Sequence, residues 1–524
     1  IIKLCFIRGR EKFDSKQLFD DDWKQFRIFN FRIIQIELIS EIYENFLAET
    51  EGSIKEDSGA YYTPPALVEF ILNDKLPIKE SDKEYRVKIL DPSCGSGIFL
   101  VQSFNRIVTR FENANNIDKL TDFKTLVDLL KQNIFGIEIN PKAIRVAAFS
   151  LYLALVDKLN PKDLWQKEEF QLPYLINDPN ETNSEKQGYN LYLRDTISDL
   201  SNEIILKNFQ LVVGNPPFGQ LLSKDKDIAA KHTNLRIYCD KHKFAKEMVL
   251  PFLHKAIDFA PEGEIALIFN TKVLTNTGST FQNFRKWLFN KCYVEKVFNF
   301  SILRKAPKRF GGQLFGDATG PISIVYYKKE EENPSKTIAY YAPKTYVRSN
   351  IIEGLCIDST DLKFLPREEC QKPDSKIWKV AMWGGMNDWE LINRLLEQKN
   401  NVITYLKSNK INYSVGLQPL NKSTEKPIID NDISAMKFIR PEKIERFYTG
   451  KDTFSNINSL LKNKDTINTY LSFYSVNTLH ELPSINAFRR ITGKDLFSGP
   501  LLLAKEGFKN NQLCFSFVEN GVVY

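Results

Sequence analysis

Short runs of apolar residues alternate with longer segments of helical periodicity from Gly59 onward, and few folds accommodate such an alternation. Five of the runs have the length of buried strands, at residues 87–90, 134–137, 211–213, 265–269 and 322–327. Between two of them, residues 143–156 form an apolar segment with the length of a helix. Strands that alternate with helices assemble into a mostly parallel sheet with helices packed on its faces. The pattern therefore predicts a doubly wound α/β fold.

The regions on either side of this alternation set the expected domain boundaries. Before it, apolar residues recur at helical spacing over residues 31–47, so residues 1–58 are expected to form a helical connector. The α/β domain is expected to span residues 59–330, followed by a linker or bridging segment at 331–375. The remainder, residues 376–524, contains 20 Lys and Arg against 14 Asp and Glu, nearly the whole excess behind the net charge of +7. A locally basic domain favours a polyanionic partner, although a solvated surface can carry a similar excess.

The overall composition excludes several classes of protein. With 43% hydrophobic and 26% charged residues among 524, the chain has the composition of a globular protein of about three domains. It has no apolar run of about 18 residues and no secretory signal, so no membrane partner is expected. The seven cysteines form no C-x-x-C pair and the four histidines no H-E-x-x-H motif, which argues against disulfides and metal sites. We therefore expect a cytoplasmic protein, and a first residue other than Met leaves open a further segment upstream.

The first candidate site follows the first apolar run. A turn with two glycines joins this run to a helix expected over residues 98–109. Glycine lets the backbone approach a ligand closely, and a helix N-terminus offers free N–H groups. The turn therefore predicts a site for a nucleotide-like cofactor at the carboxyl end of the first strand, with an ordinary strand-to-helix turn as the alternative. The candidate residues of this turn are Asp91, Cys94, Gly95, Ser96 and Gly97.

A second candidate site follows the second apolar run, where Glu138 and Ile139 precede a helix. A carboxylate at this position can accept hydrogen bonds from the two hydroxyl groups of a ribose. The separation between Asp91 and Glu138 exceeds the roughly 20 residues of the dinucleotide fingerprint, and the intervening helices account for the extra length. The alternative role for Glu138 is capping of the helix that follows.

The third motif, Asn215-Pro216-Pro217-Phe218, comes directly after the apolar run 211–213. Its two prolines lack N–H donors and hold an extended turn, so the Asn215 side chain and the Pro216 carbonyl can point the same way. Two oxygen acceptors aimed at one point can hold an amino group by both of its hydrogens, and Phe218 can stack on a planar ring. A chance pair of prolines is the alternative, but an Asn-Pro-Pro-aromatic match is rare. The motif therefore predicts a catalytic site for an amino group on a planar ring.

Together these motifs resemble those of the gamma-type, amino-group (N-6) adenine-specific DNA methyltransferases, as in type IIG restriction-modification enzymes and type I modification subunits. Residues 91–97 resemble the turn that binds S-adenosyl-L-methionine in this family, and residues 215–218 resemble its Asn-Pro-Pro-Phe catalytic motif. The order of the segments matches the gamma arrangement, whose target-recognition domain lies at the C-terminus. The resemblance implies a Rossmann-like methyltransferase fold with S-adenosyl-L-methionine as its cofactor.

The resemblance also implies roles for residues outside these motifs. Residues 59–65 are similar to the segment that covers the methionine end of the cofactor, which implies contacts from Tyr62 and Thr63. Asp195 lies where the family often has an Asp near the cofactor adenine. Asn215 is expected to contact the cofactor as well as the substrate.

The implied substrate is an adenine in double-stranded DNA. Because its amino group is inaccessible in a stacked duplex, the base would be flipped into the pocket, where Asn215 and Pro216 hold the amino group and Phe218 stacks on the ring. Residues 376–524 would form the DNA target-recognition domain, whose completeness stays open. A restriction or specificity subunit, or a nuclease fused upstream, is the further partner that the family implies.

Two basic segments are candidates for contacts with DNA. The first contains Arg304, Lys305, Lys308 and Arg309, which suit contacts with phosphates. The second is the Lys-rich stretch at residues 223–246, interpreted either as a loop that closes over DNA or as a solvated surface insertion.

Three alternatives to a DNA adenine methyltransferase stay open. Asn-Pro-Pro-aromatic sites also serve methyltransferases that act on an RNA base or a protein glutamine, although such enzymes are usually far shorter. The chain could also be the methylase part of a bifunctional type IIG restriction endonuclease, and residues 1–58 look like the connector between such halves. A non-enzymatic module with a relic pocket is disfavoured, because every expected catalytic residue is present.

Overall fold

The structure is a computed structural model, and it divides into two compact units, Ile1–Ile392 and Asn393–Tyr524. It describes residues 63–160, 171–198, 202–219, 221, 233–305, 321–348, 353–398, 400–421, 424, 426–491, 493–509, 512–519 and 521–524. The helix expected over residues 31–47 lies outside the described residues. Within them, no helix is both long and apolar enough to span a membrane.

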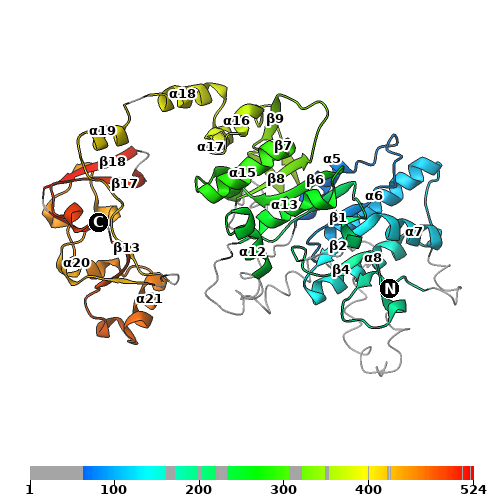
Figure 1. Cartoon of the computed structure of the whole chain (residues 1–524), viewed down its shortest axis with the longest axis horizontal. Helices are drawn as coiled ribbons and strands as arrows, with labels where there is room; N and C mark the ends of the chain where they lie inside the picture. Colours follow the sequence, from blue (N-terminus) through cyan, green and yellow to red (C-terminus); the bar gives the residue numbers. More distant parts are fainter. Residues whose placement is uncertain are drawn as a thin grey trace. The chain divides into compact units, whose positions relative to one another are not determined.

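The first unit is built on a ten-stranded sheet (Figure 1). Its strands are β1 (Ile89–Asp91), β2 (Ile134–Glu138), β3 (Ile176–Asn177), β4 (Leu191–Leu193), β5 (Leu211–Gly214), β6 (Glu264–Asn270), β7 (Tyr293–Asn299), β8 (Ile322–Lys328), β9 (Thr337–Tyr341) and β12 (Leu362–Pro366). Their order across the sheet is β12-β9-β7-β8-β6-β5-β1-β2-β4-β3. Neighbouring strands from β6 to β3 are all parallel, whereas β8 is antiparallel to both β6 and β7. The sheet is therefore mostly parallel, as predicted.

Helices cover both faces of this sheet. They are α5 (Pro65–Lys75), α6 (Ile98–Asn115), α7 (Phe123–Asn133), α8 (Pro141–Lys158), α10 (Asn202–Ile205), α12 (Thr233–His242), α13 (Val249–Phe259), α14 (Lys272–Thr275), α15 (Ser279–Lys291), α16 (Arg367–Cys370), α17 (Ile377–Trp383) and α18 (Met386–Leu396). A small pair of antiparallel strands, β10 (Thr345–Arg348) and β11 (Glu353–Cys356), lies outside the sheet.

Each face of the sheet has a hydrophobic core of its own. Along β6, residues Ile265, Leu267 and Phe269 belong to one core, while Ala266 and Ile268 belong to the other. The first core includes the buried side chains of α13 and α15, and the second includes those of α5, α6 and α8. A strand that is buried on both faces has a continuous apolar sequence rather than an alternating one. This burial explains why the five apolar runs could be recognised, and all five form strands, namely β1, β2, β5, β6 and β8.

The interval 331–375, expected as a linker or bridging segment, contributes two strands to the sheet. Strand β9 pairs with β7, and β12 pairs with β9 at the outer edge. In β9, Ile338 and Tyr340 are buried while their neighbours are half-buried, an alternation that fits a strand near the edge of a sheet. Helix α17 also packs on the first unit, because its Trp378 stacks on Phe289 of α15 with 4.8 Å between ring centroids. The first unit thus extends to Ile392, beyond the expected boundary at residue 376.

The second unit consists of two small sheets with short helices. One sheet has the order β13-β16-β14 and the other β15-β18-β17. The elements are α19 (Val402–Ser408), β13 (Gln418–Pro419), β14 (Ile428–Ile429), α20 (Asn431–Ala435), β15 (Phe447–Tyr448), α21 (Lys464–Tyr474), β16 (Ala487–Arg490), β17 (Leu501–Lys509) and β18 (Gln512–Val518). Each sheet has a small core, one around Phe488 and Tyr470 and the other around Leu503 and Cys514. Strands of two residues and short helices explain why this region shows little readable periodicity.

Candidate active site

The residues selected from the sequence gather at one edge of the sheet. Strands β5, β1, β2 and β4 are neighbours and run in the same direction, so their carboxyl ends lie side by side. Ligands bind outside the carboxyl ends of the strands in open α/β sheets. At these ends lie Asn215 after β5, Asp91 on β1, Glu138 on β2 and Asp195 after β4.

The turn between β1 and α6 is folded tightly against the neighbouring helix α8. Gly95 and Gly97 adopt positive φ angles of 51° and 92°. A Cβ atom on Gly97 would lie 2.9 Å from the Cβ atom of Ala147, so the close approach of α8 requires glycine here. Cys94 and Ser96 are buried within the turn. Gly97 is also the N-cap of α6, which places the N-terminus of this helix at the same sheet edge.

Glu138 holds the turn from the neighbouring strand. Its Oε2 atom accepts a hydrogen bond from the Gly95 N–H at 2.9 Å, and its Oε1 atom accepts one from the Asn140 N–H at 2.8 Å. The N-cap of α8 is Asn140, whose side chain accepts from the N–H groups of Lys142 and Ala143. Capping of α8 is therefore the role of Asn140 rather than of Glu138.

Two carboxyl groups with raised pKa values face this site. Asp91 is only 2% exposed, and its Oδ1 atom accepts from the Ser93 N–H at 3.0 Å. Burial, opposed by the Ser93 hydrogen bond and assisted by the nearby Glu138 carboxylate, raises the pKa of Asp91 to about 8. Burial also raises the pKa of Glu138 and outweighs the backbone hydrogen bonds it accepts, which lower this pKa. Among the described residues, no Lys or Arg contributes to the pKa shift of Asp91 or Glu138. The two carboxyl groups therefore favour a ligand that brings positive charge or hydroxyl donors.

Gly214, at the end of β5, is a site residue that the sequence reasoning did not select. A Cβ atom at this position would lie 2.5 Å from the Oδ1 atom of Asp91. Glycine here lets the end of β5 approach the Asp91 carboxyl and brings the next residue, Asn215, close to the cofactor turn. The only signal in the sequence was the glycine that separates the apolar run from the Asn-Pro-Pro motif.

The segment before α5 reaches the catalytic motif. The Nδ2 atom of Asn215 donates a hydrogen bond to Oγ1 of Thr63 at 3.0 Å. Thr63 is buried, with 6% of its surface exposed. The structure thus brings Thr63 to the predicted site, whereas Tyr62 lies outside the described residues.

The rest of the Asn-Pro-Pro-Phe motif links the two cores of the sheet. Pro216 is buried, Pro217 is half-buried, and the half-buried Phe218 packs against both hydrophobic cores. A backbone hydrogen bond holds the end of this loop, because the Gly219 carbonyl accepts from the Met248 N–H at 3.0 Å. These contacts fix the backbone on which Asn215 and the Pro216 carbonyl are presented.

Asp195 lies in a segment that is tied to the turn between β1 and α6. Its carboxylate accepts hydrogen bonds from the Ile197 N–H at 2.9 Å and from the Asn234 side chain at 2.8 Å. The next residue, Thr196, donates to the Pro92 carbonyl at 2.5 Å, which ties this segment to the turn. At the end of β2, the side chain of Ile139 is 62% exposed and so offers an apolar surface at the same edge.

The basic segment at 304–309 begins at the same edge of the sheet. Strand β7 runs in the direction of β5 and β6, because β8 is antiparallel to both β6 and β7. The backbone of Arg304 and Lys305 belongs to a 3-10 helix, Ser301–Lys305, that follows the carboxyl end of β7. Lys308 and Arg309 lie outside the described residues.

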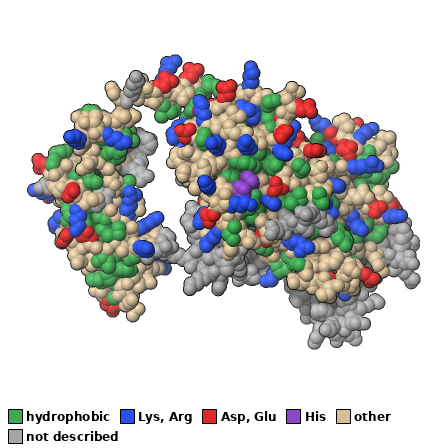
Figure 2. Space-filling view, in the orientation of Figure 1, with side chains coloured by type: hydrophobic (Ala, Val, Ile, Leu, Met, Phe, Trp, Pro, Cys, Tyr) green, Lys and Arg blue, Asp and Glu red, His purple; other side chains and the backbone are tan. Residues whose placement is uncertain are grey.

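The stretch at 223–246 is helical over its second half, so the interpretation as a loop is wrong there. Residues Thr233–His242 form α12, whose Tyr238 and His242 rings contact His254 of α13. His254 in turn packs on Trp287 of α15. The Tyr238 hydroxyl lies 2.7 Å from Nδ1 of His254, whose pKa burial lowers to about 4. Figure 2 shows histidine side chains together on the visible face of the first unit. Among the described residues, no group of three or more His, Cys, Asp or Glu side chains could hold a metal ion.

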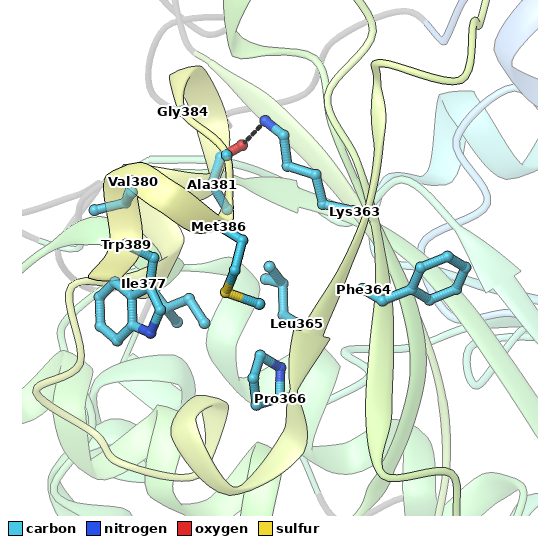
Figure 3. A pocket seen from close by; sticks show the side chains of 11 residues that line it. Lys363, Phe364, Leu365, Pro366, Ile377, Val380, Ala381, Gly384, Met386 and Trp389 are labelled. Carbon is cyan, nitrogen blue, oxygen red and sulfur yellow. Dashed lines mark hydrogen bonds between the residues drawn. The ribbon is translucent and has the colours of Figure 1, made fainter. Parts of the chain in front are cut away.

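An apolar pocket beside the outermost strand, β12, is not part of this site. It has a volume of about 190 Å³ and is lined by residues of β12, α17 and α18. Figure 3 shows Leu365 and Met386 facing one another in this pocket, while Phe364 points to the opposite side of the strand. None of the residues selected from the sequence lines it.

Comparison with known proteins gives a family match over part of the chain. The family model described as "Eco57I restriction-modification methylase" matches residues 132–304, a range that contains Glu138, Asp195 and Asn215. Over this range, about a third of its length, the chain is similar to the Eco57I restriction-modification methylases. The resemblance that the sequence motifs suggested is thereby confirmed.

Two curated relatives match over more than half of the chain. It is 25% identical over 372 residues to the adenine-specific methyltransferase PglX of Streptomyces coelicolor, a match that covers 66% of this chain and 29% of the relative. It is 23% identical over 358 residues to the type II restriction enzyme and methyltransferase RM.Eco57I of Escherichia coli, covering 61% of this chain and 33% of the relative. The chain thus spans about a third of the length of these two relatives.

Among solved structures, the chain is similar to the type IIG restriction endonuclease BpuSI. That match has a TM-score of 0.41 and 16% identity, and it covers 85% of this chain and 50% of the other. A structure of DrdV with DNA gives a TM-score of 0.41 and 15% identity, over 58% of this chain and 30% of the other.

The glycine turn between β1 and α6 allows a prediction about stability. Gly97→Ala forces a side chain into a positive φ and against Ala147, so we expect the free energy of unfolding to fall by about 2–4 kcal/mol. Gly385→Ala is the matched control, because a Cβ atom there meets only Asp388, at 4.0 Å. Urea unfolding followed by circular dichroism measures both variants, and equal midpoints would contradict the prediction.

Proposed function

We propose that the chain is a methyltransferase that moves a methyl group from S-adenosyl-L-methionine to the exocyclic amino group of adenine in double-stranded DNA, within a restriction-modification or related phage-defence system. The observation that carries the proposal is the position of the Asn-Pro-Pro-Phe motif directly beside the glycine turn. Strands β5 and β1 pair in parallel, so acceptors for an amino group and a cofactor turn lie next to each other. The names of the matched relatives, an adenine-specific methyltransferase and a restriction enzyme with methyltransferase, support this proposal.

The residues at this edge fit S-adenosyl-L-methionine, which supplies an activated methyl group when it is bound. Its positive charges suit a pocket that contains two buried carboxyl groups. Among the described residues, no Lys or Arg lowers the pKa of either group. Glu138 would accept the ribose hydroxyls, and Asp91 would lie near the positively charged part of the cofactor. The remaining candidates for this pocket are Tyr62, Thr63, Cys94, Gly95, Ser96, Gly97, Ile139, Asp195 and Asn215.

The chain's own residues would activate the substrate by position rather than by a strong base. The lone pair of the adenine amino nitrogen is delocalised into the ring, which makes it a poor nucleophile. Hydrogen bonds from its two N–H groups to Asn215 Oδ1 and the Pro216 carbonyl would direct this lone pair toward the methyl group. Phe218 would stack on the flipped base and hold it in plane. As the N–C bond forms and the methyl–sulfur bond breaks, the proton on nitrogen can leave to water.

DNA would contact the carboxyl edge of the sheet and the second unit. The basic segment with Arg304, Lys305, Lys308 and Arg309 follows β7 in the sequence, and the backbone of Arg304 and Lys305 lies after the carboxyl end of this strand. The second unit lies within the basic C-terminal part of the chain, and we propose that it is the target-recognition domain. A specificity or restriction subunit would complete the assembly in a type I arrangement.

Methyl transfer to DNA tests this proposal. The chain is incubated with methyl-labelled S-adenosyl-L-methionine and, in parallel, with unmethylated genomic DNA, RNA and a bacterial protein extract. We expect label in N6-methyldeoxyadenosine after digestion of the DNA. Label in RNA or protein alone would overturn the DNA assignment, and the absence of transfer to all three would contradict the activity of this chain.

A bifunctional restriction enzyme is a second candidate for the whole protein. It is favoured by the match to RM.Eco57I, whose name includes both a restriction enzyme and a methyltransferase. In that case the methylation activity proposed above would be unchanged, and a nuclease would belong to the same polypeptide. Cleavage of unmethylated DNA by the full-length gene product distinguishes the two arrangements.

Cofactor binding gives a second prediction. Glu138→Gln replaces a carboxylate by an amide with one acceptor oxygen, so the turn and the ribose would compete for it. Because hydrogen bonds to charged groups contribute about 1.5–3 kcal/mol, we expect the Kd for S-adenosyl-L-methionine to rise about 10- to 100-fold. Isothermal titration calorimetry measures this Kd, with the exposed Glu80→Gln as the control. Equal affinity of the two variants would exclude Glu138 from the cofactor site.

A further inference from the structure

The contact between Thr63 and Asn215 joins two segments that are 152 residues apart in the sequence. It is made by the side chains of both residues, Nδ2 of Asn215 donating to Oγ1 of Thr63 at 3.0 Å. The resemblance implied only a cofactor contact for Thr63. Its hydroxyl instead points at the residue proposed to hold the substrate.

We infer that Thr63 is a positioning residue for Asn215, which fixes the amide so that its oxygen faces the substrate amino group. This inference rests on the proposed function and adds a residue to it. Thr63 acts through Asn215 and need not touch the methyl group or the base.

The two ends of an Asn amide have opposite hydrogen-bonding character. Oδ1 accepts hydrogen bonds, whereas Nδ2 only donates them. If the amide were rotated by half a turn about its terminal bond, Nδ2 would face the adenine amino group, and two donors would oppose each other. The hydrogen bond to Thr63 holds the Nδ2 end, which turns Oδ1 away from Thr63. Because Thr63 is buried, water cannot readily replace its hydroxyl as the acceptor.

Thr63 can serve this purpose because the helix that follows it is anchored to the sheet. Four residues of α5, Leu67, Val68, Ile71 and Leu72, are fully buried in the second core. At the other end of α5, Lys75 forms ion pairs with Glu264 of β6 at 2.9 Å and with Glu295 of β7 at 2.6 Å.

A further contact fixes the end of α5 from the side of α6. Arg106 donates to the Leu76 carbonyl at 3.0 Å and to Asn73 Oδ1 at 2.8 Å. Helix α5 is therefore held by β6, which is the neighbour of β5, and by β7 and α6. The position of Thr63 relative to the end of β5 follows from these contacts rather than from the Asn215 hydrogen bond alone.

A positioning role and a cofactor-contact role affect different kinetic constants. Loss of a cofactor contact raises the Kd for S-adenosyl-L-methionine. Loss of positioning lowers kcat at saturating cofactor and DNA, because the bound adenine no longer meets a correctly oriented acceptor. The two roles can therefore be separated by substitution of Thr63 alone.

The experiment uses four variants of the chain: Thr63→Val, Thr63→Ser, Asn215→Ala and Thr63→Val with Asn215→Ala. Valine keeps the shape of threonine and removes the acceptor, whereas serine keeps the acceptor. We expect Thr63→Val to lower kcat about 10- to 100-fold with the cofactor Kd changed by less than about threefold. Thr63→Ser should restore kcat to within about threefold of wild type, and the double variant should match Asn215→Ala.

The outcomes separate this inference from the proposed function. If wild type transfers no methyl group to DNA, the proposed function fails and the inference falls with it. If wild type is active but Thr63→Val keeps its kcat and binds cofactor more weakly, only the inference fails. The same holds if Thr63→Val lowers the rate further in the Asn215→Ala background, since Thr63 would then act independently. Melting temperatures identify any variant that fails to fold. If Thr63→Val does not fold, the kcat and the cofactor Kd of Thr63→Ser test the inference instead.

Discussion

Replacement of Asn215 by Ala is expected to lower kcat for methyl transfer by at least about 10²- to 10³-fold, the range found when one preorganised polar group is removed from an active site. The amide supplies one of two proposed acceptors for the adenine amino group, and the Pro216 carbonyl alone cannot hold both hydrogens. The fold should persist, because Asn215 is half-buried and loses a hydrogen bond to Thr63 that contributes only about 1 kcal/mol. Transfer of labelled methyl groups to DNA and a thermal melt measure the two effects.

Two further variants test whether the loss of kcat in Asn215→Ala comes from the missing acceptor oxygen. Asn215→Asp keeps an acceptor oxygen in place, so it should retain more activity than the alanine variant. Asn115→Ala is the matched control, since the exposed Asn115 side chain bonds only to Phe111 within helix α6. An alanine variant at position 215 that keeps more than about a tenth of the wild-type kcat would contradict the catalytic role.

The strands that carry the site could be predicted from the sequence because they are buried on both faces. Such strands have continuous apolar sequences, and each ends at a residue whose chemistry is distinct from the run before it. The end of β1 at Asp91, the end of β2 at Glu138 and the motif after β5 were therefore recognisable. Parallel pairing then places their carboxyl ends together without any further information.

Contacts between distant segments could not be predicted in this way. The hydrogen bond from Asn215 to Thr63 depends on how α5 crosses the sheet, and no local pattern encodes that path. The need for glycine at position 214 arises from the neighbouring strand, since Asp91 limits the space there. Strand β12 lies at the edge of the sheet and β9 lies next to it, and most of their side chains are only partly buried. Both were missed because they lack the continuous apolar sequence of the strands that are buried on both faces.

Replacement of Asp91 by Asn is expected to flatten the pH dependence of stability in the absence of cofactor. The pKa of Asp91 rises from 3.8 to about 8 on folding, chiefly because burial disfavours its charged form. Between these values the folded chain binds more protons than the unfolded chain, so stability falls as pH rises. At 1.36 kcal/mol per unit, this group should cost wild type about 3 kcal/mol between pH 5 and pH 7.5. Glu138 contributes in the same direction, since burial raises its pKa as well.

The comparison of wild type with Asp91→Asn isolates this contribution, because all other titrating groups are common to both chains. We expect the difference in unfolding free energy between variant and wild type to shift by about 3 kcal/mol in favour of the variant from pH 5 to pH 7.5. Urea unfolding at several pH values measures it, with the exposed Asp118→Asn as a control for the substitution itself. A parallel pH profile for wild type and Asp91→Asn would show that the Asp91 carboxyl is already ionised in the folded chain.

The same carboxyl group connects stability to cofactor binding. A cofactor that carries positive charge favours the ionised form of Asp91, so binding below pH 8 should release a proton. The affinity of wild type for S-adenosyl-L-methionine should therefore increase with pH, by at most about tenfold per unit, up to pH 8. Asp91→Asn should bind more weakly and lose this dependence while being the more stable chain without cofactor. Calorimetric titration in buffers of different ionisation enthalpy counts the released proton directly, and a count of zero for wild type at pH 7 would contradict the proposed site of the positive charge.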